Sequence, residues 1–319
     1  MKIVVAGGTG FIGRHVARAL IEGGHDVAVL GRNPLKVSAI PELAGAGAIR
    51  ADVTDPLSLT GTLRGAQAVV GAVQFPNHPV EVPRKGLTYD RYDRQGTENL
   101  LEEAKSAGVE RYVYISGAAA DPASDRTWYR AKGLAEQAVR GSGLTWAILR
   151  PSWAYGPEDR ALNKFAAMAR FLPVVPQLGV RRQRVQPVYV EDIALAVRRL
   201  FERNDGSAPG GAEREDVWNT VYEIGGPDVM TMNEIIHTLL DVMGKKRAVV
   251  PVPAPLAKAG TAPLKLLPKP PMTPQGIEFA VQDGLVDASA VVDRLGVHPR
   301  RLREGLSEYL GRRAAGEAG

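Results

Sequence analysis

Short apolar runs rich in β-branched residues alternate with longer stretches in which apolar residues return every three or four positions. In the first half of the chain these runs predict strands at Lys2–Ala6, His25–Leu30, Ala48–Asp52, Ala68–Val73, Tyr112–Ser116 and Thr145–Leu149. The stretches between them predict helices near Gly13–Glu22, Leu57–Leu63, Tyr92–Ala107 and Arg130–Ser142. Strands that are apolar throughout, separated by amphipathic helices, favour a parallel sheet covered on both faces. Since such crossovers are right-handed, the pattern predicts an α/β fold with a doubly wound parallel sheet.

The periodicity weakens after Pro151, where several prolines interrupt it. Further elements are predicted at Val188–Asp192, leading into an amphipathic helix through Arg203, at the strand Val221–Ile224, and at the helices Thr231–Met243 and Leu302–Leu310. Residues 204–215 are rich in glycine, alanine and charge, which indicates a surface loop. Because its prolines rule out a continuous helix, we interpret Val249–Met272 as a lid, a linker or a partner surface.

The segment Gly7-Gly8-Thr9-Gly10-Phe11-Ile12-Gly13 joins the first predicted strand to the first predicted helix. Gly7 permits a tight turn, Gly10 lets the backbone approach a pyrophosphate, and Gly13 lets the helix pack closely on its strand. The first N–H groups of the helix lack internal partners and carry the positive end of its dipole, so they receive a phosphate well. A glycine turn without a ligand is the alternative, but the strand–turn–helix context favours a dinucleotide. The predicted cofactor-binding residues in this loop are Gly7, Thr9, Gly10, Phe11, Ile12 and Gly13.

The end of the second strand indicates which dinucleotide is bound. An acidic residue there would bond the ribose diol and repel a 2′-phosphate. Here the sequence is Leu30-Gly31-Arg32-Asn33, and a guanidinium such as that of Arg32 fits a phosphate in a bidentate manner. NADP(H) is therefore favoured over NAD(H), with Lys36 as a second positive charge; an Arg32 that is merely exposed in a loop is the alternative. Asp52 and Val53 are placed to meet the adenine, and the remaining predicted cofactor residues are Ala72, Val73, Lys132 and Pro151.

Several motifs resemble the extended and atypical short-chain dehydrogenase/reductase superfamily. They are the glycine segment, Asp52-Val53, Gly96–Asn99, Arg111–Ser116, Lys132, Leu149–Pro157 and Gln186–Asp192. Within that superfamily the chain looks most like the branch that includes the nucleotide-binding accessory subunit of respiratory complex I and its bacterial relatives. The resemblance implies a proton-transferring Tyr-x-x-x-Lys pair on one helix and a serine that orients the substrate oxygen. Ser116 matches the serine and Lys132 the lysine, which would also bind the nicotinamide ribose.

The tyrosine position of this motif departs from the superfamily pattern. Four residues before Lys132 stands Trp128, whose indole has no useful acid–base equilibrium near neutral pH. Tyr129 is the neighbouring phenol, rotated by roughly 100° from the expected helix face. We take Tyr129 as the candidate acid, with an ordinary packing or surface tyrosine as the alternative. The catalytic candidates are thus Ser116, Tyr129 and Lys132.

These residues leave three functions open. The first is an NADP(H)-dependent oxidoreductase acting on a bulky carbonyl or quinone-like substrate, bound between Ser116, Trp153, Arg181, Arg184 and Val249–Met272. The second is a catalytically silent accessory or sensor protein, which the loss of the phenol favours. The third is a sugar-nucleotide epimerase or dehydratase, which Arg32 and Trp128 count against.

The predicted domain organisation follows from the strand pattern and the length of 319 residues. Residues 1–160 form an NADP-binding Rossmann domain, to which 183–226 return. Residues 161–182 and 227–311 form a smaller, discontinuous C-terminal region for the substrate or a partner, and 312–319 form a flexible tail.

Composition narrows the remaining classes. The chain has no cysteine, which excludes disulfides, thiolate metal sites and a cysteine nucleophile, and its five histidines lack metal-ligand spacing, so no metal is expected. The net charge of +5 comes with basic clusters that are typical of solvated faces, and no nucleic-acid-binding pattern accompanies them. No run of about eighteen apolar residues predicts a membrane span. We expect a cytoplasmic protein with an unknown small-molecule substrate; peripheral membrane or protein-complex contact and the oligomeric state are left open.

Overall fold

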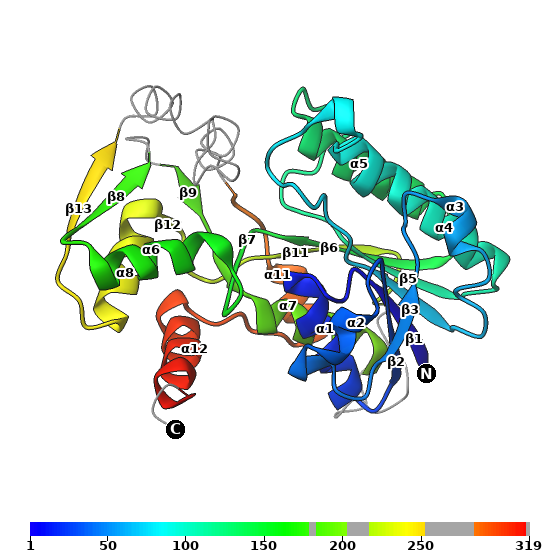
Figure 1. Ribbon diagram of the computed structural model, residues 1–319, viewed down its shortest axis with the longest axis horizontal. Helices are drawn as coiled ribbons and strands as arrows, with labels where there is room; N and C mark the ends of the chain where they lie inside the picture. Colours follow the sequence, from blue (N-terminus) through cyan, green and yellow to red (C-terminus); the bar gives the residue numbers. More distant parts are fainter. Residues whose placement is uncertain (179–182, 203–216, 253–283, 317–319) are drawn as a thin grey trace.

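The computed structural model of the chain (Figure 1) describes residues 1–178, 183–202, 217–252 and 284–316. Its main sheet has seven strands in the order β11-β6-β5-β4-β1-β2-β3, and every pairing in it is parallel. The strands are β1 Lys2–Ala6, β2 Asp26–Gly31, β3 Gly47–Arg50, β4 Ala68–Gly71, β5 Arg111–Ile115, β6 Thr145–Pro151 and β11 Thr220–Ile224. The predicted α/β doubly wound fold is confirmed.

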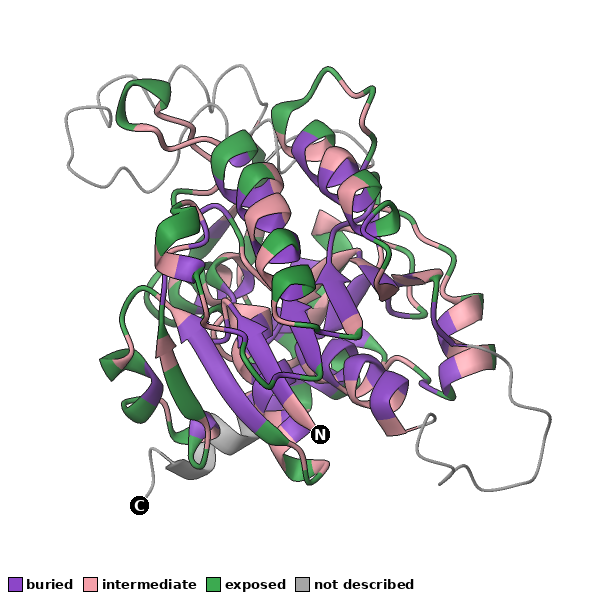
Figure 2. Ribbon diagram, turned by 90° about the vertical axis from the view of Figure 1, so that its right-hand side faces the viewer, coloured by how far each residue is buried: buried purple, intermediate pink, exposed green. Residues whose placement is uncertain are grey.

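Helices cover both faces of this sheet (Figures 1 and 2). On one face lie α1 Phe11–Glu22, α7 Val190–Glu202 and α11 Ser289–Leu295; on the other lie α3 Pro56–Leu59, α4 Gly96–Ser106 and α5 Thr127–Arg140. Successive residues of a strand point to opposite faces, so Ile3 and Val5 join the core beneath α1 and α7, whereas Val4 joins the core beneath α4 and α5. This explains why the strands are apolar at every position.

The strand β1 lies between β2 on one side and β4 on the other, so the order in which the chain adds strands to the sheet changes direction at β1. Two chain connections leave that point in opposite directions, so the carboxyl ends of β1 and β4 border a crevice. Other short segments are α2 Leu35–Ser38, the 3-10 turns Pro41–Leu43 and Pro83–Lys85, and the π-helical turn Asp90–Gln95 that precedes α4. The crevice is where ligands bind in folds of this type.

A second, smaller core lies beside the carboxyl ends of the sheet (Figure 1). It contains α6 Arg160–Phe171, α8 Met232–Val242 and α12 Leu302–Gly316, with the strand pairs β7 Trp153–Tyr155 and β10 Pro187–Tyr189, β8 Val174–Leu178 and β13 Ala248–Val252, and β9 Arg184–Val185 and β12 Met230–Thr231. The α8 helix begins at the predicted cap, where the Thr231 hydroxyl accepts from the Glu234 N–H in a capping box.

Several elements differ from the sequence-based prediction. The helices α6 and α11 had not been predicted, and the helix expected over Leu57–Leu63 ends at Leu59. The helix α12 continues to Gly316, into the stretch predicted as a tail. The surface loop at 204–215, most of Val249–Met272 and Arg181 lie outside the described residues. The proposed domain boundaries stay a prediction, although β11, from the stretch 183–226, does pair with β6 in the main sheet.

Candidate nucleotide site

The loop between β1 and α1 requires glycine at two positions. Gly7 has φ +80°, and a Cβ on it would lie 2.6 Å from the carbonyl oxygen of Ala72. A Cβ on Gly13 would lie 2.3 Å from the carbonyl oxygen of Gly7, so a side chain there would push the helix off the loop. The exposed Gly10 caps α1 and donates its own N–H to the Gly7 carbonyl at 2.9 Å. The next N–H groups, at the start of α1, therefore lie at the carboxyl end of β1.

The predicted cofactor residues gather at the carboxyl ends of neighbouring strands. Arg32 directly follows β2, is exposed, and holds its guanidinium carbon 5.9 Å from the centre of the Tyr92 ring. Lys36 is exposed on α2. The Ala72 N–H donates to the Ala6 carbonyl at 2.9 Å and so extends the β1–β4 edge. Pro151 ends β6, where its carbonyl accepts the Ala118 N–H at 2.9 Å.

The turn after β3 is ordered by Asp52 itself. One carboxylate oxygen of Asp52 accepts both the N–H and the hydroxyl of Thr54, each at 2.9 Å. Val53 is buried, and its carbonyl accepts the side-chain amide of Asn99 at 2.8 Å, which ties the turn to α4. Asn99 belongs to one of the motifs that carry the superfamily resemblance, and its contact here is a structural one.

Ser116 directs its hydroxyl into α5 rather than towards Lys132. The hydroxyl donates to Glu136 at 2.6 Å, and Glu136 is 1% exposed. The same carboxylate accepts from Arg150 at 2.7 and 2.8 Å and from Arg140 at 3.0 Å. Sequence reasoning missed Glu136, although it stands one helical turn after Lys132. The structure therefore places Ser116 in a buried polar network.

Trp128 and Tyr129 lie in the first turn of α5, with their ring centres 4.8 Å apart. The Arg126 guanidinium lies over the Tyr129 ring, 5.9 Å from its centre. Burial raises the pKa of the Tyr129 phenol above its ordinary value, and the nearby Arg126 only partly counters this. A proton-transferring phenol needs the opposite shift.

Lys132 is buried against the end of β5. Its ammonium lies 3.1 Å from the carboxylate of Asp93, donates to the Ile115 carbonyl at 3.1 Å, and sits 5.0 Å from the centre of the Tyr114 ring. Burial alone would lower the Lys132 pKa, but Tyr114 and Asp93 outweigh it and hold that pKa above its ordinary value. The fully buried Asp93 belongs to the π-helical turn and was missed from the sequence.

A hydrogen-bonded aromatic pair covers this end of α5. His78 Nδ1 lies 2.6 Å from the Tyr89 hydroxyl, and the His78 ring centre is 6.3 Å from that of Trp128. Burial lowers the pKa of His78 to about 4, with the charges of Lys132 and Arg160 acting in the same direction. His78 is therefore neutral near pH 7. Neither His78 nor Tyr89 had been singled out from the sequence.

A family model described as NAD(P)H-binding matches residues 7–191, from the glycine loop to the start of α7. The chain belongs to this NAD(P)H-binding family. The match covers the loop, the exposed Arg32, and the residues around Lys132, so nucleotide binding rests on more than the glycine spacing.

The curated relatives are of two kinds: some are named as subunits of a larger assembly, and others are named as enzymes. The alpha subcomplex subunit 9 of mitochondrial NADH dehydrogenase from Arabidopsis thaliana is 29% identical over 96% of this chain and 76% of its own length. The 40 kDa subunit of NADH-ubiquinone oxidoreductase from Neurospora crassa is 26% identical over 96% of this chain and 78% of its own length. A 2-alkyl-3-oxoalkanoate reductase from Stenotrophomonas maltophilia and a ceramide reductase from Caulobacter vibrioides are 29% and 28% identical over 77% and 79% of this chain, and over 77% and 74% of their own lengths.

Solved structures share the fold of the whole chain. A UDP-glucuronic acid 4-epimerase from Bacillus cereus, in complex with NAD, has a TM-score of 0.73 at 19% identity over 98% of this chain and 99% of the epimerase chain. An NADPH-dependent quinone oxidoreductase from Escherichia coli, complexed with NADPH, has a TM-score of 0.69 at 22% identity over 97% of this chain and 99% of its own. Since one neighbour holds NAD and the other NADPH, the fold agrees with either nucleotide.

The prediction of partners needs correction. It named an unknown small molecule as the partner and gave contact with a protein complex only as an open option. Relatives from Arabidopsis thaliana, Neurospora crassa and Dictyostelium discoideum are named as subunits of NADH dehydrogenase or NADH-ubiquinone oxidoreductase. The prediction that treated a protein complex only as an open option is therefore wrong.

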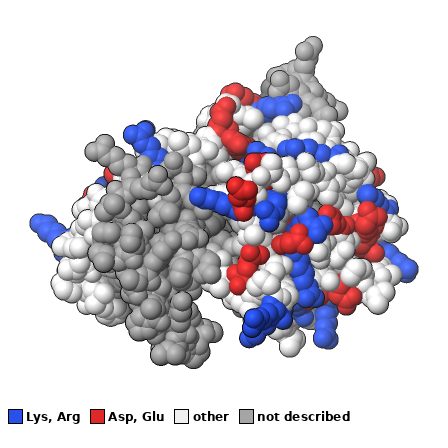
Figure 3. All heavy atoms as spheres, turned by 90° about the horizontal axis from the view of Figure 1, so that it is seen from above, with Lys and Arg blue, Asp and Glu red and all other residues white. Residues whose placement is uncertain are grey.

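Among the described helices, none is both long enough and apolar enough to cross a membrane. On the face drawn in Figure 3, basic and acidic side chains are interspersed over the described part.

Proposed function

We propose that this protein binds NADP(H) at the carboxyl ends of β1, β2 and β4. We propose further that it is an accessory or sensing protein, which does not use a Tyr–Lys pair to turn over a substrate. One observation carries the second half of this proposal: Ser116, Tyr129 and Lys132 engage three different partners. Ser116 bonds Glu136, Tyr129 stacks beside Arg126, and Lys132 pairs with Asp93. Each of the three side chains is thus engaged in a contact of its own within the protein.

The preference for NADP(H) is supported by the residues that follow β2. No carboxylate stands at Gly31, Arg32 or Asn33, so nothing there would repel a 2′-phosphate. The Arg32 guanidinium is exposed, and the Tyr92 ring beside it restricts its position. A planar guanidinium that is already oriented loses less conformational freedom when it binds a phosphate.

The accessory role is supported by the relatives named as subunits of mitochondrial NADH dehydrogenase, which match nearly the whole chain. A protein of this kind needs the nucleotide for its conformation rather than for its chemistry. The buried Lys132–Asp93 pair and the Ser116–Glu136 bond are compatible with such a role, because both stabilise the floor of the site without needing a substrate.

A second candidate is a reductase of a bulky carbonyl or quinone-like substrate. It is supported by the relatives named 2-alkyl-3-oxoalkanoate reductase and ceramide reductase, and by the His78–Tyr89 pair beside Lys132. In such a reaction the nucleotide would supply hydride, and the protein would need to deliver a proton to the substrate oxygen. An epimerase or dehydratase is supported by fold alone.

Calorimetry of the purified protein with NADPH, NADP⁺, NADH and NAD⁺, followed by turnover assays, tests the proposal. We expect NADPH to bind at least about tenfold more tightly than NADH, since a charge-assisted bond contributes about 1.5–3 kcal/mol. We expect no oxidation of NADPH with β-keto esters, aldehydes or short-chain quinones. Turnover with any of these substrates would establish the reductase instead, and Ser116→Ala, Tyr129→Phe and Tyr89→Phe would then show which hydroxyl the reaction needs. Absence of heat with all four nucleotides would remove both candidates.

A further inference from the structure

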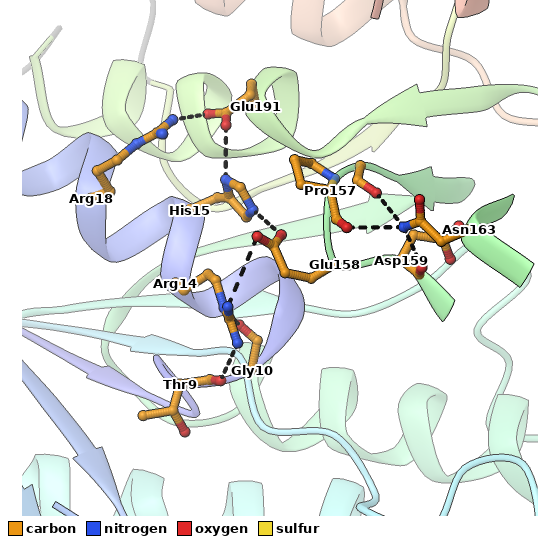
Figure 4. A network of polar contacts seen from close by, with 11 residues as sticks. Thr9, Gly10, Arg14, His15, Arg18, Pro157, Glu158, Asp159, Asn163 and Glu191 are labelled. Atoms are coloured by element: carbon orange, nitrogen blue, oxygen red, sulfur yellow. Dashed lines mark hydrogen bonds and ion pairs between the residues drawn. The ribbon is translucent and has the colours of Figure 1, made fainter. Parts of the chain in front are cut away.

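A network of charged groups joins the glycine loop to the start of the smaller core (Figure 4). At its centre is His15 of α1, which is 2% exposed. Its Nε2 lies 2.8 Å from a Glu158 oxygen, and its Nδ1 lies 2.8 Å from a Glu191 oxygen. Ionised carboxylates only accept hydrogen bonds, so both ring nitrogens must donate and His15 is an imidazolium.

Three elements supply the charges that face His15. Glu158 comes from the turn before α6, and Glu191 comes from the first turn of α7. On α1 itself, Arg18 bonds the other oxygen of Glu191, and Arg14 lies 3.9 Å from Glu158. Two carboxylates and two guanidiniums therefore surround one imidazolium, and the α1 helix is tied to α7 and to the turn before α6.

Arg14 extends this network to the nucleotide loop. Its guanidinium donates to the Thr9 carbonyl at 3.2 Å and to the Gly10 carbonyl at 3.4 Å. In a trans peptide the C=O and the following N–H point in opposite directions. The Gly10 carbonyl accepts the Arg14 backbone N–H at 3.1 Å as well as the guanidinium, so the Phe11 N–H is directed to the opposite side of the loop, where a pyrophosphate would lie.

The turn that carries Glu158 is itself firmly held. The Asp159 carboxylate caps α6 by accepting the N–H groups of Ala161 and Leu162 at 3.0 and 2.6 Å. The side-chain amide of Asn163 donates to the carbonyls of Gly156, Pro157 and Asp159, at 3.1, 2.9 and 2.6 Å. A shift of Glu158 therefore moves the whole turn, and the hydrogen bonds of the turn restrain Glu158.

Gly156 brings the same turn close to both helices. A Cβ on Gly156 would lie 2.7 Å from Val190 of α7 and 3.4 Å from the ring of Phe11. Phe11 is the first residue of α1 and packs against the smaller core. The turn thus touches the residue whose N–H faces the predicted phosphate position.

We propose that Arg14 and Glu158 are nucleotide-positioning residues: Glu158 orients Arg14, Arg14 fixes the carbonyls of the glycine loop, and His15 ties Glu158 to α7. Nucleotide binding is then coupled to the order of residues 156–163. This inference rests on the proposed binding of NADP(H). It adds the residues that hold the glycine loop in its nucleotide-binding conformation. It also adds the contacts through which a bound nucleotide affects the smaller core.

Affinity measurements on five variants of the full chain test it. Arg14→Met removes the guanidinium but keeps the length of the side chain, and we expect the Kd for NADPH to rise about tenfold. Glu158→Gln should raise it about threefold, and Arg14→Lys should recover part of the loss. Arg18→Met is the matched control, because Arg18 shares the helix and the network but does not contact the loop; its Kd should match that of the wild-type protein. The double variant Arg14→Met/Glu158→Gln should lose no more than Arg14→Met alone.

Two further readouts separate positioning from general stability. Unfolding by urea without nucleotide should show similar losses for Arg14→Met and Arg18→Met, whereas only Arg14→Met weakens NADPH. Hydrogen exchange of the amides of 160–163 should slow when NADPH binds to the wild-type protein, and this slowing should vanish in Arg14→Met. Unchanged affinities in Arg14→Met and Glu158→Gln, with normal binding by the wild-type protein, would overturn this inference alone. No NADPH binding by the wild-type protein would overturn the proposed function and this inference with it.

Discussion

The indole of Trp128 occupies the space in which a side chain at residue 117 would lie. A Cβ built on Gly117 would be 2.9 and 3.0 Å from two carbons of the indole six-membered ring. Gly117 directly follows Ser116, and Trp128 stands at the position where the superfamily motif has its tyrosine. The missing side chain and the bulky indole are therefore two halves of one packing arrangement, and restoring a phenol at 128 would leave a void over Gly117.

This relationship predicts a size-dependent response at residue 117. Gly117→Ala should lower the free energy of unfolding by about 1–3 kcal/mol, because the added methyl group overpacks against the indole. The same change combined with Trp128→Leu should cost less than the sum of the two single changes. Equilibrium urea unfolding measures all three. Gly31→Ala is the matched control, since a Cβ there meets nothing within 4 Å. Additive losses in the double variant would contradict the packing argument.

The Lys132–Asp93 pair predicts that replacing Asp93 alone destabilises the protein much more than replacing both residues of the pair. Asp93→Asn leaves a buried ammonium without its charge partner and should cost about 3–5 kcal/mol of unfolding free energy. Asp93→Asn combined with Lys132→Met should be less damaging than Asp93→Asn alone, because no uncompensated charge is left. For comparison, Asp90→Asn breaks a more exposed pair with Arg94 and should cost less than about 1 kcal/mol. Equal losses at positions 90 and 93 would show that Lys132 is not held by Asp93.

The His15 network predicts a bounded pH range for its stabilising effect. Burial would lower the His15 pKa, but Glu158 and Glu191 outweigh it and raise that pKa above 6.5. Burial would raise the pKa of each of the two glutamates, but His15 and the neighbouring arginines outweigh it and lower both below 4.5. The imidazolium contribution is complete below pH 6.5 and is lost as pH rises through the raised His15 pKa. The carboxylate contributions are complete above pH 4.5 and are lost as pH falls through the lowered glutamate pKa values.

The stabilising effect should therefore be largest between about pH 4.5 and 6.5. Urea unfolding of the wild-type protein and His15→Ala, repeated from pH 3.5 to 9, should give a difference in unfolding free energy that peaks in this range. His237→Ala, on the exposed face of α8, should give a small difference throughout. A His15→Ala difference that keeps rising above pH 8 would contradict the doubly bonded imidazolium.

The strands of the first half could be predicted from the sequence because each strand carries its own signal in adjacent residues. The helix α6 could not, because its buried face consists of Leu162, Ala166 and Ala169, and alanine adds little to an apolar pattern. The partners of Lys132 and Ser116 were missed for another reason. Asp93 lies far from Lys132 along the chain and meets it only through the packing of the π-helical turn on α5. Only Glu136, one turn from Lys132, could have been inferred from helical spacing.

The proposed preference for NADP(H) depends on a single exposed side chain, and we expect that it can be reversed by design. Arg32→Ala should weaken NADPH binding at least about tenfold and leave NADH unchanged, because only the 2′-phosphate bonds are lost. Arg32→Asp places a carboxylate after β2, where it can bond the ribose diol, and should make NADH the tighter ligand. Arg64→Ala is the control, because Arg64 is exposed beside Lys2 at the opposite end of the sheet. Calorimetry with both reduced nucleotides gives the ratio directly. If Arg32→Ala lowers both affinities equally, Arg32 supports the loop in general and some other group recognises the 2′-phosphate.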